Sequence, residues 1–225
     1  MGLDFTYFLY VMPAFLLGLW AQAKVRSTFA HASQQRASLS GAAAARHLLD
    51  EAGLQDVNIE AIPGHLSDHY DPRAKVLRLS EAVYNQRSLA AVGIAAHEAG
   101  HAIQDQKRYF PLVVRNAAVP AASIGSSASL FMLIGGMIFQ FQPLILLGII
   151  AFAAVVFFQV VNLPVEFDAS HRAKALLVER GIVPAAEMGP INKVLNAAAL
   201  TYVAATLQAV MTLLYYIMRF SGSRD

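Results

Sequence analysis

The chain has 225 residues, of which 56% are hydrophobic and 14% are charged, and its formal net charge is +2. In soluble domains about a quarter of the residues are charged, so this composition and the mean hydropathy of +0.48 favour a membrane protein. Cysteine is absent, which excludes disulfides, thiolate metal sites and a cysteine nucleophile. The small net charge, without clusters of arginine, argues against a nucleic-acid partner.

Four stretches without charged residues are long enough, at about 20 residues, to cross a bilayer as helices. They are residues 5–23, 117–139, 143–164 and 197–218. Only three residues separate the second stretch from the third, which predicts a tight hairpin. The first stretch lacks a basic segment in front of it, so we interpret it as a retained anchor and not as a signal peptide.

The distribution of lysine and arginine predicts the orientation in the membrane. Eleven of the 17 lie in residues 24–116 and four in residues 165–196. Cytoplasmic loops carry the excess of basic residues, so both segments are expected in the cytoplasm and the N-terminus outside. The predicted segments are a transmembrane helix at 1–23, a cytoplasmic segment at 24–116, a transmembrane hairpin at 117–164, a cytoplasmic segment at 165–196, and a transmembrane helix with its tail at 197–225.

The longer cytoplasmic segment shows alternating helix and strand signals. Residues 38–53 have apolar side chains at helical spacing and end in a glycine, which predicts a helix. Residues 57–62 and 75–79 read as short strands, and the second could be either an edge strand that pairs with an extended peptide or an ordinary strand of a sheet. Ser88 is a suitable N-cap for a helix that runs to about Lys107. The predicted fold is an all-α membrane protein with four transmembrane helices and a small cytoplasmic α+β insertion.

The helix after Ser88 carries the pattern HExxH at His97, Glu98 and His101. Histidines at positions i and i+4 lie on one face of a helix, where they can share one zinc ion. Glu98 points toward the same site at a different angle, which suits a general base for a zinc-bound water. Gly100 is unfavourable inside a helix by about 1 kcal/mol and leaves room for another element near the metal.

A catalytic zinc needs a third protein ligand and one open position. Glu166, Asp168 and His171 follow the third predicted span directly and offer three possible ligands within six residues. Two spans separate them from His101, and this even number places both pieces on the same side of the membrane. The residues alone leave the choice among the three open.

The chain resembles the bacterial membrane-bound neutral zinc metallopeptidases of the YugP type over most of its length. Four motifs carry this resemblance: Gly64-His65-Leu66-Ser67-Asp68-His69-Tyr70-Asp71-Pro72, Leu77-Arg78-Leu79-Ser80, Ala96-His97-Glu98-Ala99-Gly100-His101-Ala102-Ile103-Gln104, and Leu163-Pro164-Val165-Glu166-Phe167-Asp168-Ala169-Ser170. The resemblance implies a zincin-like HExxH helix of the gluzincin class. It also implies that His97, His101 and Glu166 bind one Zn²⁺ per chain and that Glu98 is the base.

A more distant likeness is to the heat-shock-type and prenyl-protein membrane metallopeptidases, which carry an aspartate four residues after the glutamate ligand. Here that position is Ser170, so the chain departs from their pattern. The aspartate normally orients a metal-bound histidine. Asp168 would lie on nearly the opposite side of a helix from Glu166, and the group that takes over the orienting role is left open.

Several other residues have an ordinary structural explanation as well as a functional one. His171 or Arg172 could stabilise the oxyanion of a tetrahedral intermediate, although a basic residue near a membrane surface is ordinary for Arg172. His69 could help to bind substrate, whereas Asp68 and Asp71 fit Asx turns without a ligand role.

The predicted function is a zinc-dependent integral-membrane endopeptidase of the bacterial cytoplasmic membrane, with its active site at the cytoplasmic surface. Its expected partners are the lipid bilayer and a polypeptide substrate, membrane-associated or misfolded. The alternative is a non-catalytic, zinc-stabilised membrane scaffold that binds another protein. A transporter is disfavoured because the spans contain no ionisable residues. The sequence does not indicate an oligomeric state.

Overall fold

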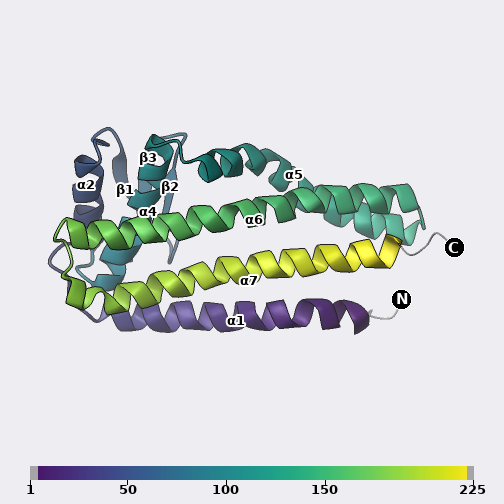
Figure 1. Ribbon diagram of the computed structural model, residues 1–225, viewed down its shortest axis with the longest axis horizontal. Helices are drawn as coiled ribbons and strands as arrows, with labels where there is room; N and C mark the ends of the chain where they lie inside the picture. The colour runs from purple at the N-terminus through teal and green to yellow at the C-terminus, as the bar shows by residue number, and fades with distance from the viewer. Residues whose placement is uncertain (1–4, 222–225) are drawn as a thin grey trace. The chain divides into compact units, whose positions relative to one another are not determined.

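The computed structural model describes residues 5–221, and four of its helices are long and apolar enough to cross a membrane. Most of the described chain is helical (Figure 1). In chain order the elements are α1 (Phe5–Ser33), α2 (Gly41–Glu51), β1 (Asn58–Ile62), β2 (His69–Asp71), β3 (Val76–Ser80), α3 (Glu81–Asn85), α4 (Leu89–Gln106), α5 (Phe110–Ile138), α6 (Gln142–Glu179), a 3₁₀ turn η1 (Ala185–Glu187) and α7 (Met188–Ser221).

Each predicted span coincides with one of the four long helices, except that Phe139, the last residue of the second span, follows the end of α5, and every one of these helices is longer than its span. Helix α1 continues to Ser33, α5 already begins at Phe110, and α7 begins at Met188. Helix α6 runs through Pro164 to Glu179. Charged residues end a membrane span but not a helix, because the backbone hydrogen bonds of the helix do not depend on the side chains.

The described chain forms two compact units, and the first consists of residues 5–20, 113–164 and 201–221. Within it α5 and α6 form the predicted hairpin, since α5 ends at Ile138 and α6 begins at Gln142. The two helices approach each other closely at glycines. A Cβ atom on Gly125 would lie 2.6 Å from the carbonyl oxygen of Ala151, so only glycine fits there.

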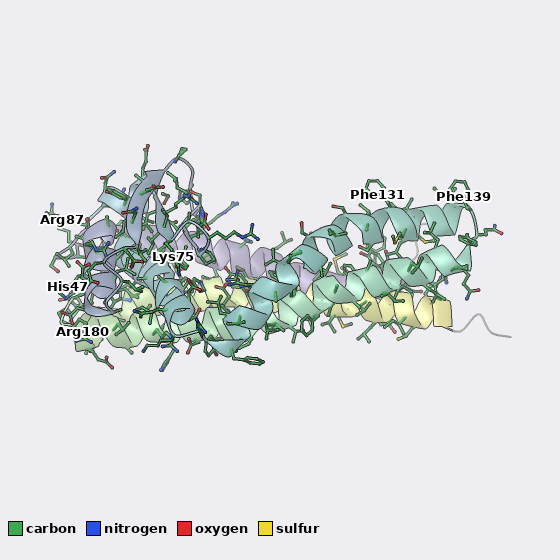
Figure 2. The ribbon with its side chains drawn as sticks, turned by 90° about the horizontal axis from the view of Figure 1, so that it is seen from above. His47, Lys75, Arg87, Phe131, Phe139 and Arg180 are labelled. Carbon is green, nitrogen blue, oxygen red and sulfur yellow. The ribbon has the colours of Figure 1, made fainter. Side chains whose placement is uncertain are left out.

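Large apolar side chains cover the outside of this first unit. Phe131 of α5 and Phe139, which directly follows α5, project away from the ribbon and are 74% and 77% exposed (Figure 2). A soluble protein rarely exposes so much contiguous apolar surface. This surface fits contact with the hydrocarbon chains of a bilayer.

The second unit consists of residues 21–112 and 165–200 and contains a three-stranded sheet in the order β1-β3-β2. Strands β1 and β3 are parallel, and β2 runs antiparallel to β3. Leu77 and Leu79 of β3 are fully buried and belong to the same apolar core as α2 and α4 (Figure 1). Helix α4 begins as predicted, because the hydroxyl of Ser88 accepts a hydrogen bond from the amide of Ala91 at 3.2 Å.

Strand β2 is absent from the sequence-based prediction, which treated these residues as a turn. Because β2 and β1 flank β3, the hypothesis that residues 75–79 form an edge strand for substrate is wrong. The hydroxyl of Tyr70, on β2, donates a hydrogen bond to Asp105 of α4 at 2.9 Å. Burial and this hydrogen bond raise the pKa of Tyr70 above its ordinary value. The contact ties β2 to the helix that carries the HExxH pattern.

Candidate metal centre

Helix α4 presents His97 and His101 one turn apart, with their ring centroids 4.8 Å from each other. Gly100 allows α6 to approach this turn. A Cβ atom at Gly100 would lie 2.8 Å from the carbonyl oxygen of Ala169 on α6, closer than real Cβ contacts allow. The room that the sequence predicted beside Gly100 is therefore filled by the backbone of α6.

Helix α6 brings Glu166 to the two histidines. The Oε2 atom of Glu166 lies 3.3 Å from Nε2 of His97 and 3.7 Å from Nε2 of His101. One potential ligand atom from each of the three residues lies within 4.8 Å of the others. Two ligands at about 2.0–2.1 Å from a tetrahedral zinc are themselves roughly 3.3 Å apart, so this spacing fits a metal between them. We call these three residues the metal centre.

The carboxylate of Glu166 is buried, and one of its oxygens has no hydrogen-bond partner among the described residues. The residue is 5% exposed, and its buried Oε2 atom accepts no hydrogen bond from any other described residue. A buried oxygen without a partner costs about 1–3 kcal/mol, and more when it is charged. Two imidazole nitrogens and one carboxylate oxygen are a common donor set for zinc. The residues present therefore fit a zinc ion.

Both histidines have a hydrogen-bonding partner at the ring nitrogen that faces away from Glu166. Nδ1 of His97 lies 3.1 Å from the hydroxyl of Ser170, and Nδ1 of His101 lies 3.0 Å from Oε1 of Gln104. Such partners fix the ring and leave Nε2 for the metal. Sequence reasoning missed both roles. The signals it could have used are the spacing of three residues from His101 to Gln104 and of four from Glu166 to Ser170.

Glu98 is a buried carboxylate without a structural partner. It is 8% exposed, and no hydrogen bond or ion pair within residues 5–221 engages it. Burial lowers the pKa of His101, but the carboxylates of Glu166 and Glu98 outweigh burial and raise it above its ordinary value. Glu98 is therefore close enough to act electrostatically on the metal centre. A buried, unpaired acid beside such a centre is typical of a catalytic group.

His171 and Arg172 lie at a separate hollow of the second unit. A cavity of about 400 Å³ between α2, α4 and α6 is lined in part by Lys107, His171, Arg172 and Arg180, and by no residue of the metal centre. Arg172 is engaged with Asp168, at 2.5 Å between Nε and Oδ2. His171 and Arg172 are not among the residues whose ligand atoms gather at the metal centre, and a role of either residue on the oxyanion stays a prediction.

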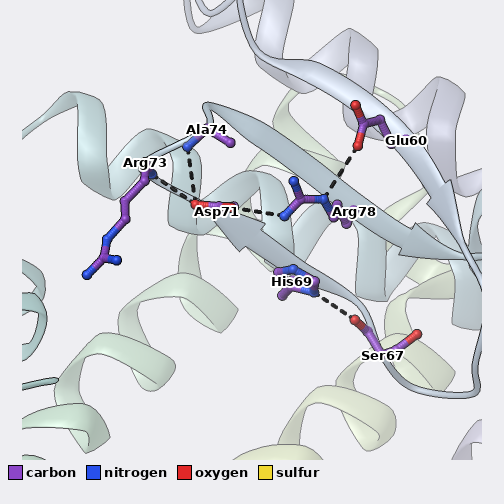
Figure 3. A network of polar contacts seen from close by, with 7 residues as sticks. All are labelled: Glu60, Ser67, His69, Asp71, Arg73, Ala74 and Arg78. Atoms are coloured by element: carbon purple, nitrogen blue, oxygen red, sulfur yellow. Dashed lines mark hydrogen bonds and ion pairs between the residues drawn. The ribbon is translucent and has the colours of Figure 1, made fainter. Parts of the chain in front are cut away.

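His69, the first residue of β2, and Asp68, which precedes it, form hydrogen bonds with residues of the neighbouring loop and of β3. Nδ1 of His69 lies 2.8 Å from the carbonyl oxygen of Ser67, and the imidazole is exposed (Figure 3). The carboxylate of Asp68 accepts hydrogen bonds from the amide and the hydroxyl of Ser80, at 2.7 and 3.0 Å. Neither residue belongs to the metal centre.

Asp71 forms the Asx turn that the sequence predicted. Its Oδ1 atom accepts hydrogen bonds from the amides of Arg73 and Ala74, and its Oδ2 atom accepts one from Arg78 at 2.9 Å (Figure 3). The hydrogen bond from Arg78, together with the two amides, holds the pKa of Asp71 below its ordinary value. Arg78 also pairs with Glu60 across the sheet at 3.4 Å. This network links the turn to β3 and β1.

Known proteins match the chain along nearly its whole length. Residues 7–221 match the model of a family described as "Putative neutral zinc metallopeptidase". A protein of Bacillus subtilis (strain 168) named "Putative membrane protease YugP" is 48% identical over 211 residues, which cover 93% of this chain and 94% of the relative. No solved structure matches the chain.

Proposed function

Because the chain belongs to the neutral zinc metallopeptidase family, we propose that it is a zinc-dependent endopeptidase whose metal is held by His97, His101 and Glu166. The observation that carries the proposal is the buried Oε2 atom of Glu166, which faces the Nε2 atoms of both histidines without a hydrogen bond. Zinc, when bound, polarises a peptide carbonyl and makes water acidic enough to attack it near neutral pH.

Glu98 supplies the proton transfers of the proposed reaction. Its carboxylate takes a proton from the attacking water and later gives it to the nitrogen of the leaving amine. The carboxylate of Glu98 is available for these transfers because no other described residue forms a hydrogen bond or ion pair with it, and because it lies beside the metal centre. Ser170 and Gln104 hold the two imidazoles in place during these steps.

Removal of the metal tests the proposed activity. Protein purified in detergent is expected to cleave an unfolded protein such as casein, to lose this activity in a chelator, and to regain it with about one equivalent of Zn²⁺ per chain. A chain that binds zinc and cleaves no unfolded or membrane-associated polypeptide would contradict the proposal and favour the scaffold. Cleavage of short soluble peptides alone would contradict the proposed class of substrate.

We propose further that the second unit faces the cytoplasm, since it contains most of the lysines and arginines. The chain has no cysteine, so a single introduced thiol reports its own side of the membrane. In intact spheroplasts, a membrane-impermeant maleimide is expected to label Phe139→Cys and to label Arg87→Cys only after permeabilisation. Both positions are exposed, and the reverse pattern of labelling would invert the orientation.

A further inference from the structure

Gln104 is a fully buried polar residue whose three hydrogen bonds all lead to the metal centre or to α6. It lies on α4, three residues after His101, and its side chain is 0% exposed. Its Oε1 atom lies 3.0 Å from Nδ1 of His101. Its Nε2 atom donates to the carbonyl oxygen of Val165 at 2.9 Å and to Oδ2 of Asp168 at 2.7 Å.

These partners allow only one orientation of the amide of Gln104. A carbonyl oxygen and a carboxylate can only accept, so the NH₂ group has to face Val165 and Asp168. The amide oxygen then faces His101, and because it too can only accept, Nδ1 of His101 carries the proton. The Nε2 atom of His101 is left with its lone pair directed to Glu166.

Asp168 is itself held in place by Arg172, which donates to the same carboxylate oxygen as Gln104. Its Oδ2 atom lies 2.5 Å from Nε of Arg172, one turn further along α6. The guanidinium of Arg172 also lies over the ring of Tyr109, 5.7 Å from its centroid. The result is a continuous chain of contacts from Arg172 through Asp168 and Gln104 to His101.

We propose that Gln104, held by Asp168, is a positioning residue that fixes the tautomer and the ring orientation of His101 for metal binding. This inference rests on the proposed function, because it requires that His101 be a zinc ligand. In the families that the sequence resembles more distantly, one aspartate orients a metal-bound histidine. In this chain two residues share that role: Ser170 contacts His97, and Gln104 connects the carboxylate of Asp168 to His101 through hydrogen bonds.

Gln104→Met tests this role, because methionine keeps the length of the side chain and removes both ends of the amide. The variant is expected to bind Zn²⁺ about 10–100-fold more weakly than the native chain, as loss of an orienting partner commonly does. The measurement is competition against a chromophoric chelator in detergent. Gln106→Met is the matched control on the same helix: Gln106 bonds only the carbonyl oxygen of Ala52, and zinc affinity should not change.

Asp168→Leu, which removes the oxygen that accepts the hydrogen bond from Gln104, distinguishes a relay from simple packing. Alone, this substitution should weaken zinc binding. In the Gln104→Met background it should have no further effect, because the hydrogen bonds that connect residue 168 to His101 are already lost. Equal zinc affinity of Gln104→Met and the native chain, or additive effects of the two substitutions, would refute the relay while leaving the zinc site intact. If the native chain binds no zinc, the relay and the proposed function both fail. If Gln104→Met does not fold, unchanged affinity in Asp168→Leu is sufficient to refute the relay.

Discussion

Replacement of Glu98 by glutamine is expected to reduce proteolysis by about 10²–10⁴-fold, the usual contribution of a general base, and to leave bound zinc unchanged. Glutamine has the shape of glutamate but cannot take up the proton of water at neutral pH. The carboxylate of Glu98 is not a ligand in the proposed site, so its removal leaves all three ligands in place. Loss of activity without loss of metal is the combination that identifies a base.

The measurement is the rate of cleavage of an unfolded protein, with the zinc content of the same preparation determined by elemental analysis. Glu81→Gln is the control, since Glu81 is an exposed carboxylate at the start of α3 and should retain full activity. Native rates in Glu98→Gln would remove Glu98 from the mechanism. If function in cells were also unchanged while zinc remained bound, the non-catalytic scaffold would be the better description.

The helices of the second unit were predictable where a local signal marks them. Ser88 and Ser40 both cap the helices that follow them, as their side chains allow. The ends of the long helices were not predictable from the apolar spans. Hydropathy indicates which residues can lie in the bilayer, and it does not indicate where the hydrogen-bonded helix begins or ends. Strand β2 was missed because its three residues, His69, Tyr70 and Asp71, show no alternation of apolar and polar side chains that would mark a strand.

The metal centre likewise has some features that local spacing in the sequence predicts and others that depend on packing between distant segments. The spacing of His97 and His101 follows from the period of the helix, so the sequence alone predicts that both face one point. The meeting of Glu166 with them depends on how closely α4 and α6 pack at Gly100. The contact of Gln104 with Asp168 depends on the same packing, and no spacing along the chain encodes it.

Glu166→Ala is expected to lose most of the zinc that the native chain holds, from about one ion per chain to a small fraction of that. The substitution removes the only one of the three proposed ligands that α6 supplies and leaves two imidazoles from a single helix. The loss of affinity should exceed the about 10–100-fold expected for an orienting residue such as Gln104. Elemental analysis of detergent-purified protein measures it directly.

Glu179→Ala is the matched control, because Glu179 is an exposed carboxylate on the same helix and far along it from the metal centre. Its zinc content should equal that of the native chain. Circular dichroism and thermal unfolding of both variants separate loss of a ligand from loss of the fold.

The two candidate ligands near Glu166 on α6, Asp168 and His171, are not free to replace it in this variant. The carboxylate of Asp168 is held by Gln104 and Arg172, and His171 lines a cavity that the metal centre does not reach. Full zinc in Glu166→Ala would therefore require a third ligand from elsewhere, either Glu98 of α4 or a residue of α6 released from these contacts. Because either outcome removes Glu166 from the ligand set, full zinc in this variant would contradict the proposed metal centre.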